Sequence, residues 1–145
     1  MYRSSKTIGN LPCAHRRWRH NGHCKWVHGY SRSFEFWFES DNLDEMGFVV
    51  DFGGLKWLQE WLLSKYDHTL LIDESDPLLP MFLALEQQEG CKLTVYENVG
   101  MEGSAEYVGS YVKEKLEELY GDRVRLISVE CRENDKNSGG IWYSK

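Results

Sequence analysis

The sequence has 145 residues, of which 41% are hydrophobic and 28% are charged, so we expect residues 1–145 to form one globular domain rather than a disordered chain. The longest uninterrupted apolar stretch, Leu78 to Leu85, is far shorter than the about 20 residues of a membrane helix, and the first residues lack a secretory signal. These two features predict a cytoplasmic protein without a membrane segment, and its net charge is −6.

The first half of the chain predicts a strand followed by two helices. Residues 33–39 (SFEFWFE) alternate phenylalanine with polar or larger side chains, the period-two pattern of a half-buried strand. Residues 48–52 would be the end of a partner strand or the entry to a helix. Residues 54–66 repeat apolar side chains at three- and four-residue spacing, which predicts an amphipathic helix. A shorter helix is expected over residues 76–89.

The second half of the chain predicts a strand, a helix and a hairpin. A short strand is expected at residues 92–96, and a helix between Ser104 as N-cap and Gly121 as the terminating residue. Residues 124–131 alternate as a strand, and the NDKNSGG turn returns the chain at residues 141–143. The order of elements predicts an α+β fold, with an antiparallel four-stranded sheet covered on one face by helices.

The positive charge is concentrated at one end of the chain. Residues 1–34 contain seven lysines and arginines and no acid, whereas the remainder contains 10 basic and 23 acidic residues. A cationic segment on an acidic protein indicates a localised anion such as a phosphate group more than general binding of nucleic acid. The alternative is that this charge matches acidic groups on another subunit or in another part of the fold.

The segment from His15 to Tyr30 carries the strongest chemical signal. It holds four of the five histidines together with a cysteine, and imidazole and thiolate are ligands that zinc prefers. The spacing fits no standard zinc finger, and the alternative is a polar loop whose histidines only make hydrogen bonds. The side chains concerned are His15, His20, His23, Cys24 and His28.

Two further sites have carboxylates in suggestive positions. Asp67 precedes His68, and a carboxylate beside an imidazole can orient the ring and raise its basicity for acid–base catalysis, although most such dipeptides have no function. Glu130 lies among apolar positions of the last long strand, where it either contacts water at the strand end or binds a ligand.

Seven short motifs follow one another along the chain: Ala14-His15-Arg16, Cys24-x3-His28-Gly29-Tyr30, Gly47-Phe-Val-Val-Asp51-Phe52, Asp67-His68-x2-Leu71, Ser104-Ala105-Glu106, Val129-Glu130 and Gly140-Ile-Trp-Tyr143. Each motif is weak by itself, but the ordered series resembles the family of 6-pyruvoyl-tetrahydropterin and 6-carboxytetrahydropterin synthases. The resemblance extends over residues 13–143. The Cys-x3-His spacing is closer to the 6-carboxytetrahydropterin branch than to the 6-pyruvoyl branch.

The resemblance implies the tunnelling fold, in which small α+β subunits join their sheets into a barrel, usually a hexamer, with active sites between subunits. It also implies zinc bound by three histidines, of which the first two match His15 and His28. The third falls on Tyr30, and a neutral tyrosine is a poor zinc ligand. Either Tyr30 binds as a phenolate, or His23 (or His20) supplies the third nitrogen, or zinc is lost; we expect His23.

The resemblance further implies a zinc-dependent lyase that converts 7,8-dihydroneopterin triphosphate to 6-carboxy-5,6,7,8-tetrahydropterin and acetaldehyde, on the route to queuosine and other 7-deazaguanines. Cys24 would be the general base, and Asp67 with His68 would relay a proton. Glu130 would bind the pterin ring, and Glu106 would also contact the substrate. The candidates to neutralise the triphosphate are Arg16, Arg17, Arg19 and Lys25.

Three alternatives remain open on the sequence alone. The activity could be that of the 6-pyruvoyl-tetrahydropterin branch. The chain could be a non-catalytic module that binds a pterin or a nucleotide, which would account for the missing third histidine. It could also be a zinc-stabilised nucleic-acid binder that uses the basic segment, and steep salt dependence would then be its signature.

Overall fold

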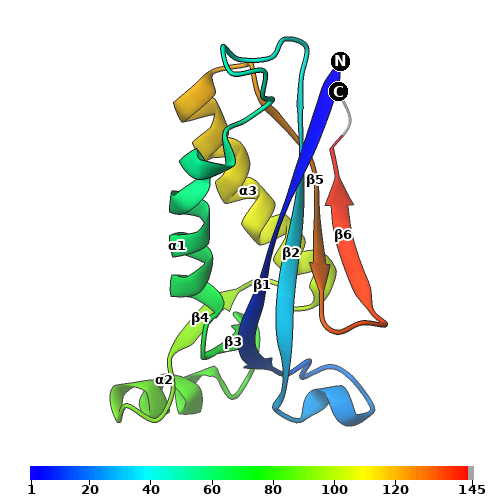
Figure 1. The fold of residues 1–145 in the computed structure, drawn as a ribbon. Coiled ribbons are helices and arrows are strands. Elements are labelled where there is room, and N and C mark those ends of the chain that lie inside the picture. The colour runs from blue at the N-terminus through cyan, green and yellow to red at the C-terminus, as the bar shows by residue number, and fades with distance from the viewer. Residues whose placement is uncertain (144–145) are drawn as a thin grey trace.

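Two long antiparallel strands, β1 (Tyr2–His15) and β2 (His28–Ser40), form the centre of the sheet in the computed structural model, which describes residues 1–143 (Figure 1). Next to β2, β5 (Arg125–Arg132) continues the sheet in antiparallel direction. The last strand, β6 (Ser138–Trp142), pairs with β5 as the second half of a hairpin. The predicted strand at the first phenylalanines and the predicted C-terminal hairpin are therefore both present.

On the other side of the central pair, β3 (Thr69–Asp73) lies parallel to β1, and β4 (Leu93–Tyr96) lies parallel to β3. The strand order is β4-β3-β1-β2-β5-β6. The predicted sheet of four antiparallel strands is therefore wrong in strand number and in these two parallel pairings. The sequence of β3, TLLID, has three consecutive apolar residues at its centre and is mostly buried, so it lacks the alternation that identifies a half-buried strand.

The alternation pattern does not identify β1 either, and a β-bulge is the reason. The register between β1 and β2 shifts between Ile8 and Leu11, where Asn10 has a φ of 58°. Because of the extra residue, Ile8 and Leu11 are both buried although they are three positions apart. The bulge thus interrupts the period of two in the sequence while the strand continues in space.

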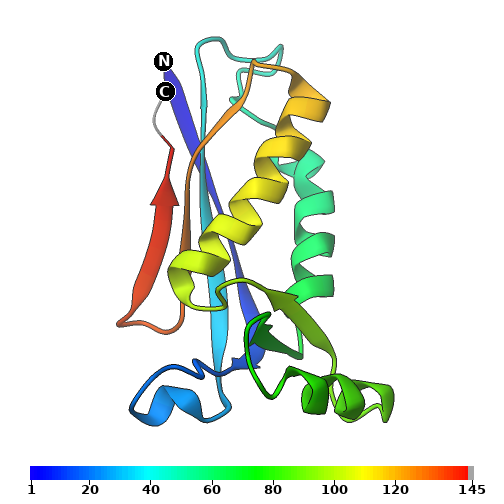
Figure 2. The ribbon, with the colours of Figure 1, turned by 180° about the vertical axis from the view of Figure 1, so that it is seen from behind.

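Two helices, α1 (Lys56–Tyr66) and α3 (Met101–Tyr120), cover one face of the sheet, whereas the short α2 (Leu79–Gln87) lies at its β3–β4 end (Figures 1 and 2). These helices confirm the predicted ones within a few residues at each end. Residues 48–52 form no strand but lead into a 3-10 turn, η2 (Phe52–Leu55), at the entry to α1. In the described part of the chain, no helix is both long enough and apolar enough to cross a bilayer.

The core lies between the sheet and these two helices. Phe34, Phe36 and Phe38 are fully buried, which confirms the predicted alternation of β2. Each of these positions removes an aromatic ring from water, a contribution of about 1.5–3 kcal/mol per side chain. On the opposite face of the sheet, Trp37 and Trp142 are 37% and 65% exposed. The buried helix residues that meet the phenylalanines' face include Leu58, Leu62, Val108, Val112 and Leu116.

The ends of α3 differ in how well the sequence predicts them. Gly121 follows the last residue with a φ of 62°, which confirms it as the terminating residue. The N-cap, however, is Gly100 and not Ser104. Ser104 is fully buried within α3, where its hydroxyl accepts a hydrogen bond from Arg32 Nη1 at 2.7 Å. The sequence pattern alone predicts Ser104 as a cap, because its actual hydrogen-bond partner, Arg32, lies on the distant strand β2.

Candidate active site

Two histidines meet where β1 ends and β2 begins. His15 is the last residue of β1 and His28 the first of β2, and the antiparallel register pairs them directly. Their ring centroids lie 4.5 Å apart. Residues 16–27 leave the sheet as a loop and return to the same place (Figure 1). Two of the three predicted metal ligands are therefore brought together by the strand pairing itself.

Both rings present a nitrogen lone pair. His15 is 5% exposed, and within residues 1–143 its Nδ1 has no hydrogen-bond partner. Burial lowers the pKa of His15 to about 3, and the nearby charges of Arg32 and Arg17 add to this effect, so the ring is neutral at pH 7. His28 Nδ1 donates to the Trp26 carbonyl at 2.6 Å, which leaves Nε2 free to accept.

A carboxylate reaches the same place from the β5–β6 turn. Glu133 directly follows β5, and one ligand atom from each of Glu133, His15 and His28 lies within 4.8 Å of the others. Zinc donors in a tetrahedral site lie about 3.3 Å apart, so small side-chain movements would close this set around an ion. The donors and the unpartnered His15 nitrogen therefore fit a divalent metal. Sequence reasoning missed Glu133, although it continues the buried face of Val129 and Cys131.

The other candidates for the third ligand lie outside this group. His23 is exposed and stacks on Trp26, with ring centroids 5.5 Å apart and planes 9° apart. His20 is exposed as well, and its Nδ1 accepts a hydrogen bond from the Gly22 amide. The ring of Tyr30 lies 5.5 Å from that of His28. The structure thus keeps Tyr30 near the histidine pair and turns His23 toward a different partner.

Cys24 lies on the short 3-10 turn η1 (His23–Lys25), in the loop that connects the two histidines. Its carbonyl accepts a hydrogen bond from the Arg17 amide at 2.7 Å, which folds the loop back toward His15. Cys24 is only partly buried, whereas Cys13 and Cys131 belong to the core. Burial raises the pKa of Cys131 to about 12 and also raises that of Cys13, so both remain protonated thiols.

The Asp67–His68 pair lies at the junction of α1 and β3. Asp67 Oδ1 is 3.0 Å from His68 Nδ1, so the carboxylate does orient the ring. The His68 amide donates to the Pro12 carbonyl at 2.7 Å, which ties the pair to the end of β1 that carries His15. His68 has a φ of 54°, and its side chain is 81% exposed. The Asp67 carboxylate therefore fixes the ring of His68 through Nδ1, and the rest of the ring is exposed to solvent.

Glu130 lies on the face of the sheet opposite to the histidine pair. In β5 it pairs directly with Glu35 of β2, whereas Phe34 and His28 belong to the other set of alternating β2 residues. Arg132 Nη2 contacts Glu130 Oε1 at 3.0 Å on the same face. Within one chain, the predicted pterin-binding carboxylate therefore does not join the predicted metal ligands.

Glu106 lines a cavity that is distinct from the site of the His15–His28 pair. It lines a cavity of about 670 Å³ between α1, α3 and β4, together with Trp61, Tyr96 and Tyr107. Tyr96 stacks on Tyr107 with ring centroids 4.1 Å apart, and burial raises the pKa of Tyr96 to about 12. Among the described residues that line this cavity, none belongs to the β1–β2 loop. Glu106 therefore does not line the same cavity as Cys24 or the His15–His28 pair.

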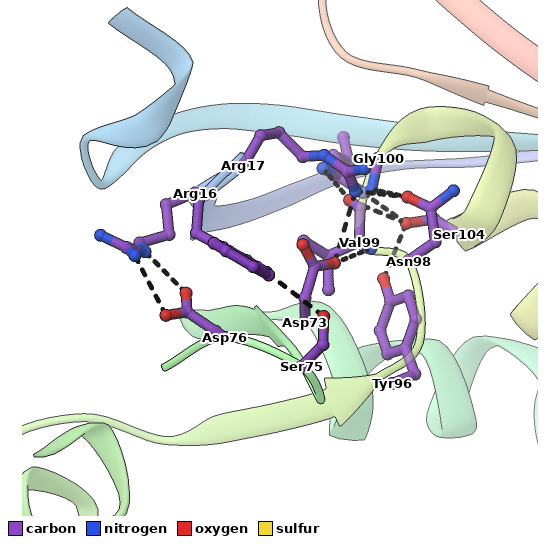
Figure 3. A network of polar contacts seen from close by, with 12 residues as sticks. Arg16, Arg17, Asp73, Ser75, Asp76, Tyr96, Asn98, Val99, Gly100 and Ser104 are labelled. Carbon is purple, nitrogen blue, oxygen red and sulfur yellow. Dashed lines mark hydrogen bonds and ion pairs between the residues drawn. The ribbon is translucent and has the colours of Figure 1, made fainter. Parts of the chain in front are cut away.

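Two of the basic residues proposed for the triphosphate are already paired inside the protein. Arg16 forms a bidentate ion pair with Asp76, with Nε donating to Oδ2 at 2.6 Å and Nη2 donating to Oδ1 at 3.0 Å (Figure 3). Arg17 Nη1 lies 3.4 Å from Asp73 Oδ1 and also contacts Asn98. The sequence interpretation that matches positive charge to acids in another part of the fold therefore holds for these two residues.

The same network continues into the core (Figure 3). Asp73 Oδ1 accepts the Val99 amide at 2.8 Å, and Arg32 donates to the Val99 carbonyl at 2.9 Å. Arg32 is fully buried, so it fixes the start of α3 against β2 at two points, the Val99 carbonyl and Ser104. Loop residue Arg17, strand β3 and helix α3 are thereby joined beside the histidine pair.

Comparison with known proteins identifies the family of the chain. The family model for 6-pyruvoyl tetrahydropterin synthase matches residues 6–143. A relative named 6-carboxy-5,6,7,8-tetrahydropterin synthase, from Aquifex aeolicus, is 28% identical over 144 residues and covers 86% of this chain and 88% of its own.

Two solved structures share the fold. An uncharacterised protein from Wolinella succinogenes has a TM-score of 0.84 at 21% identity, over 99% of this chain and 98% of its own. The 6-pyruvoyltetrahydropterin synthase of Plasmodium vivax has a TM-score of 0.69 at 14% identity, over 97% and 98% of the two chains. The α+β fold and the enzymatic nature of the relatives confirm the expectations from the motifs. The chain belongs to the 6-pyruvoyl tetrahydropterin synthase family of enzymes.

Proposed function

We propose that this protein is a zinc-dependent lyase that converts 7,8-dihydroneopterin triphosphate to 6-carboxy-5,6,7,8-tetrahydropterin. The observation that carries the proposal is the histidine pair, His15 and His28, at 4.5 Å with an unpartnered buried nitrogen on His15. These two residues would hold the ion. When bound there, zinc would supply Lewis acidity toward an oxygen of the substrate side chain. The Cys-x3-His spacing and the names of the relatives support the 6-carboxytetrahydropterin branch.

The proton transfers fall to the chain's own residues. Cys24 is the general base, because it is a partly buried cysteine on the loop that joins the two histidines. His68, oriented by Asp67, moves a second proton, and its exposed ring suits a substrate bound between molecules. The exposed Arg19 and Lys25 bind the triphosphate, since Arg16 and Arg17 are engaged with Asp76 and Asp73.

The pterin ring requires a second copy of the chain. Glu130 faces away from the histidines, so we propose that it accepts the pterin N–H groups of a substrate whose side chain lies at a neighbouring chain's histidine pair. The exposed Trp37 and Trp142 on the same face provide apolar surface for that contact. This arrangement makes the protein a homo-oligomer, with a hexameric barrel as the expected form.

Product analysis tests the activity. The zinc-loaded protein, incubated with 7,8-dihydroneopterin triphosphate, is expected to give 6-carboxytetrahydropterin, acetaldehyde and inorganic triphosphate by mass spectrometry. Cys24→Ala should abolish turnover, while Cys91→Ala, a second partly buried free cysteine, should retain it. A 6-pyruvoyl product would assign the other branch. Binding of the substrate without any product would refute the lyase and leave a pterin-binding module.

Mixing two inactive variants tests the shared site. Cys24→Ala and Glu130→Gln would each be inactive alone, but a co-refolded equal mixture should recover about a quarter of the activity if each site takes one residue from either chain. Recovery arises because a quarter of the sites then receive both intact residues. No recovery from a mixture shown to exchange chains would contradict the shared site.

A further inference from the structure

We infer that Glu133 is the third protein ligand of the metal, so that the centre is built from His15, His28 and Glu133. This inference rests on the metal-dependent function proposed above and replaces the sequence-based expectation for His23. In the family pattern the third ligand is a histidine at the position of Tyr30. In this chain a carboxylate from the β5–β6 turn would take that role. The cofactor class is a divalent transition-metal ion, and zinc is the probe for which the donor set is best suited.

The strand pairing brings Glu133 to the histidines. His28 and Phe34 lie on the same face of β2, and Cys131, directly opposite Phe34, continues this face on β5. Glu133 comes two residues after Cys131, just past the end of β5, so alternation directs it to the same face. The β5–β6 turn and the β1–β2 loop also lie at the same end of the sheet (Figure 1). The ligand atoms accordingly converge within 4.8 Å.

The turn that carries Glu133 is anchored independently of the carboxylate. The Glu133 amide donates to the Asn137 carbonyl at 3.1 Å, and Asn134 Oδ1 accepts the amides of Lys136 and Asn137. The backbone of the turn therefore has its hydrogen bonds without using the Glu133 side chain. That side chain is partly buried next to His15, whose Nδ1 lacks a partner in residues 1–143.

Two histidines and a glutamate form a chemically complete zinc set. Such a set leaves a fourth position open, as catalytic zinc sites do. A glutamate carboxylate is an ordinary zinc ligand, whereas a neutral tyrosine such as Tyr30 is a poor one. The carboxylate also lowers the positive charge of the loaded centre by one relative to three neutral imidazoles. Glu133 thus accounts for a working site despite Tyr30.

Zinc binding to the purified full chain tests the assignment directly. Competition with a chromophoric chelator gives the zinc dissociation constant, and cobalt(II) substitution gives a visible spectrum that reports the donor set. Glu133→Gln is expected to weaken zinc at least about 100-fold, more than the loss of an outer-sphere partner would. Glu133→His should restore most of the affinity with an altered cobalt spectrum, because it returns a donor to the same place.

Three variants serve as matched controls. Asp135→Asn removes the same charge from the same turn at an exposed position, whereas His23→Ala and Tyr30→Phe remove the competing ligands. Each should bind zinc within about threefold of the unchanged protein, and melting of the metal-free forms confirms that each variant folds. The assignment is overturned if Glu133→Gln binds zinc like Asp135→Asn, or if Tyr30→Phe or His23→Ala loses as much affinity as Glu133→Gln.

The outcomes separate this inference from the proposed function. Normal product formation together with unchanged zinc affinity in Glu133→Gln would overturn the ligand assignment and leave the lyase intact. Absence of zinc binding in the unchanged protein would overturn both. Zinc affinity that depends on Glu133 in a protein that forms no product would support the assignment and refute the lyase.

Discussion

Replacing Arg16 by methionine is expected to destabilise the fold rather than to weaken substrate binding. The guanidinium contacts both oxygens of Asp76, and the two side chains are 15% and 0% exposed. Asp76 Oδ1 also accepts the Leu78 amide at 2.9 Å, where the chain turns into α2. Methionine keeps the apolar stem of Arg16 but leaves a buried carboxylate without its cation.

The magnitude follows from this geometry. Breaking a buried ion pair by removing one partner costs about 3–5 kcal/mol, and the slight exposure of Arg16 places this pair near the lower limit. We therefore expect a loss of about 3 kcal/mol in the free energy of unfolding, which for a chain of this size lowers Tm by about 6–12 °C. The double variant Arg16→Met/Asp76→Asn should recover at least about 1 kcal/mol of the loss, because no unpaired charge is then buried.

Thermal and urea unfolding, together with steady-state kinetics, provide the assay. Arg19→Met is the matched control, since Arg19 is exposed and its guanidinium lies 4.5 Å from the Trp18 ring with no acid among its described contacts. It should leave Tm unchanged and raise KM for the triphosphate substrate about tenfold, the loss of one charge-assisted contact. If Arg16→Met melts like the unchanged protein and raises KM instead, the structural role of Arg16 is wrong.

Three further perturbations have definite expected results. Phe36→Ala should cost about 3–5 kcal/mol in urea unfolding, because its ring is fully buried in the sheet–helix core. Gly121→Ala should cost about 1 kcal/mol, since φ is 62° at the end of α3, and an unchanged midpoint would contradict that backbone role. In chelator-treated protein, His15 has a folded pKa of about 3, below the unfolded value of 6.5, so its contribution to stability is present above pH 6.5 and is lost as pH falls toward 3. Between pH 7 and 5 the unchanged protein should lose about 2 kcal/mol more than His15→Gln, and equal losses would refute the shift.

Local sequence patterns identified the elements whose burial is decided by their own periodicity. The phenylalanines of β2 and the apolar stripe of α1 each repeat with the period of the structure they form, so their faces can be read directly. β1 and β3 depend on partners instead. The bulge at Asn10 matters only once β2 is alongside, and β3 becomes a buried strand only between β1 and β4. Such information is not contained in a short window of sequence.

The site shows the same division. His15, Cys24 and His28 crowd one loop, so composition alone marks them as a group. Glu133 is more than a hundred residues away from His28, and only the pairing of β2 with β5 makes the two neighbours. Likewise, the partners of Arg16 and Arg17 lie on the β3 side of the fold, which is why the basic segment resembled an open anion site. A count of charged residues along the sequence does not show which charges are neutralised by residues that are distant in the chain.

If the proposed function is right, the alternation of the sheet makes a single chain an incomplete enzyme. Alternation assigns the histidines and Glu133 to one face, and Glu130 to the other, although Glu130 and Glu133 are only three residues apart on the same strand and turn. Only a register shift by one residue would exchange these faces, and such a shift would also expose the core phenylalanines. A substrate that needs both the metal and Glu130 must therefore obtain them from different chains. Under the proposed function, assembly would be a condition of catalysis, and we expect monomeric protein to bind zinc without turning over substrate.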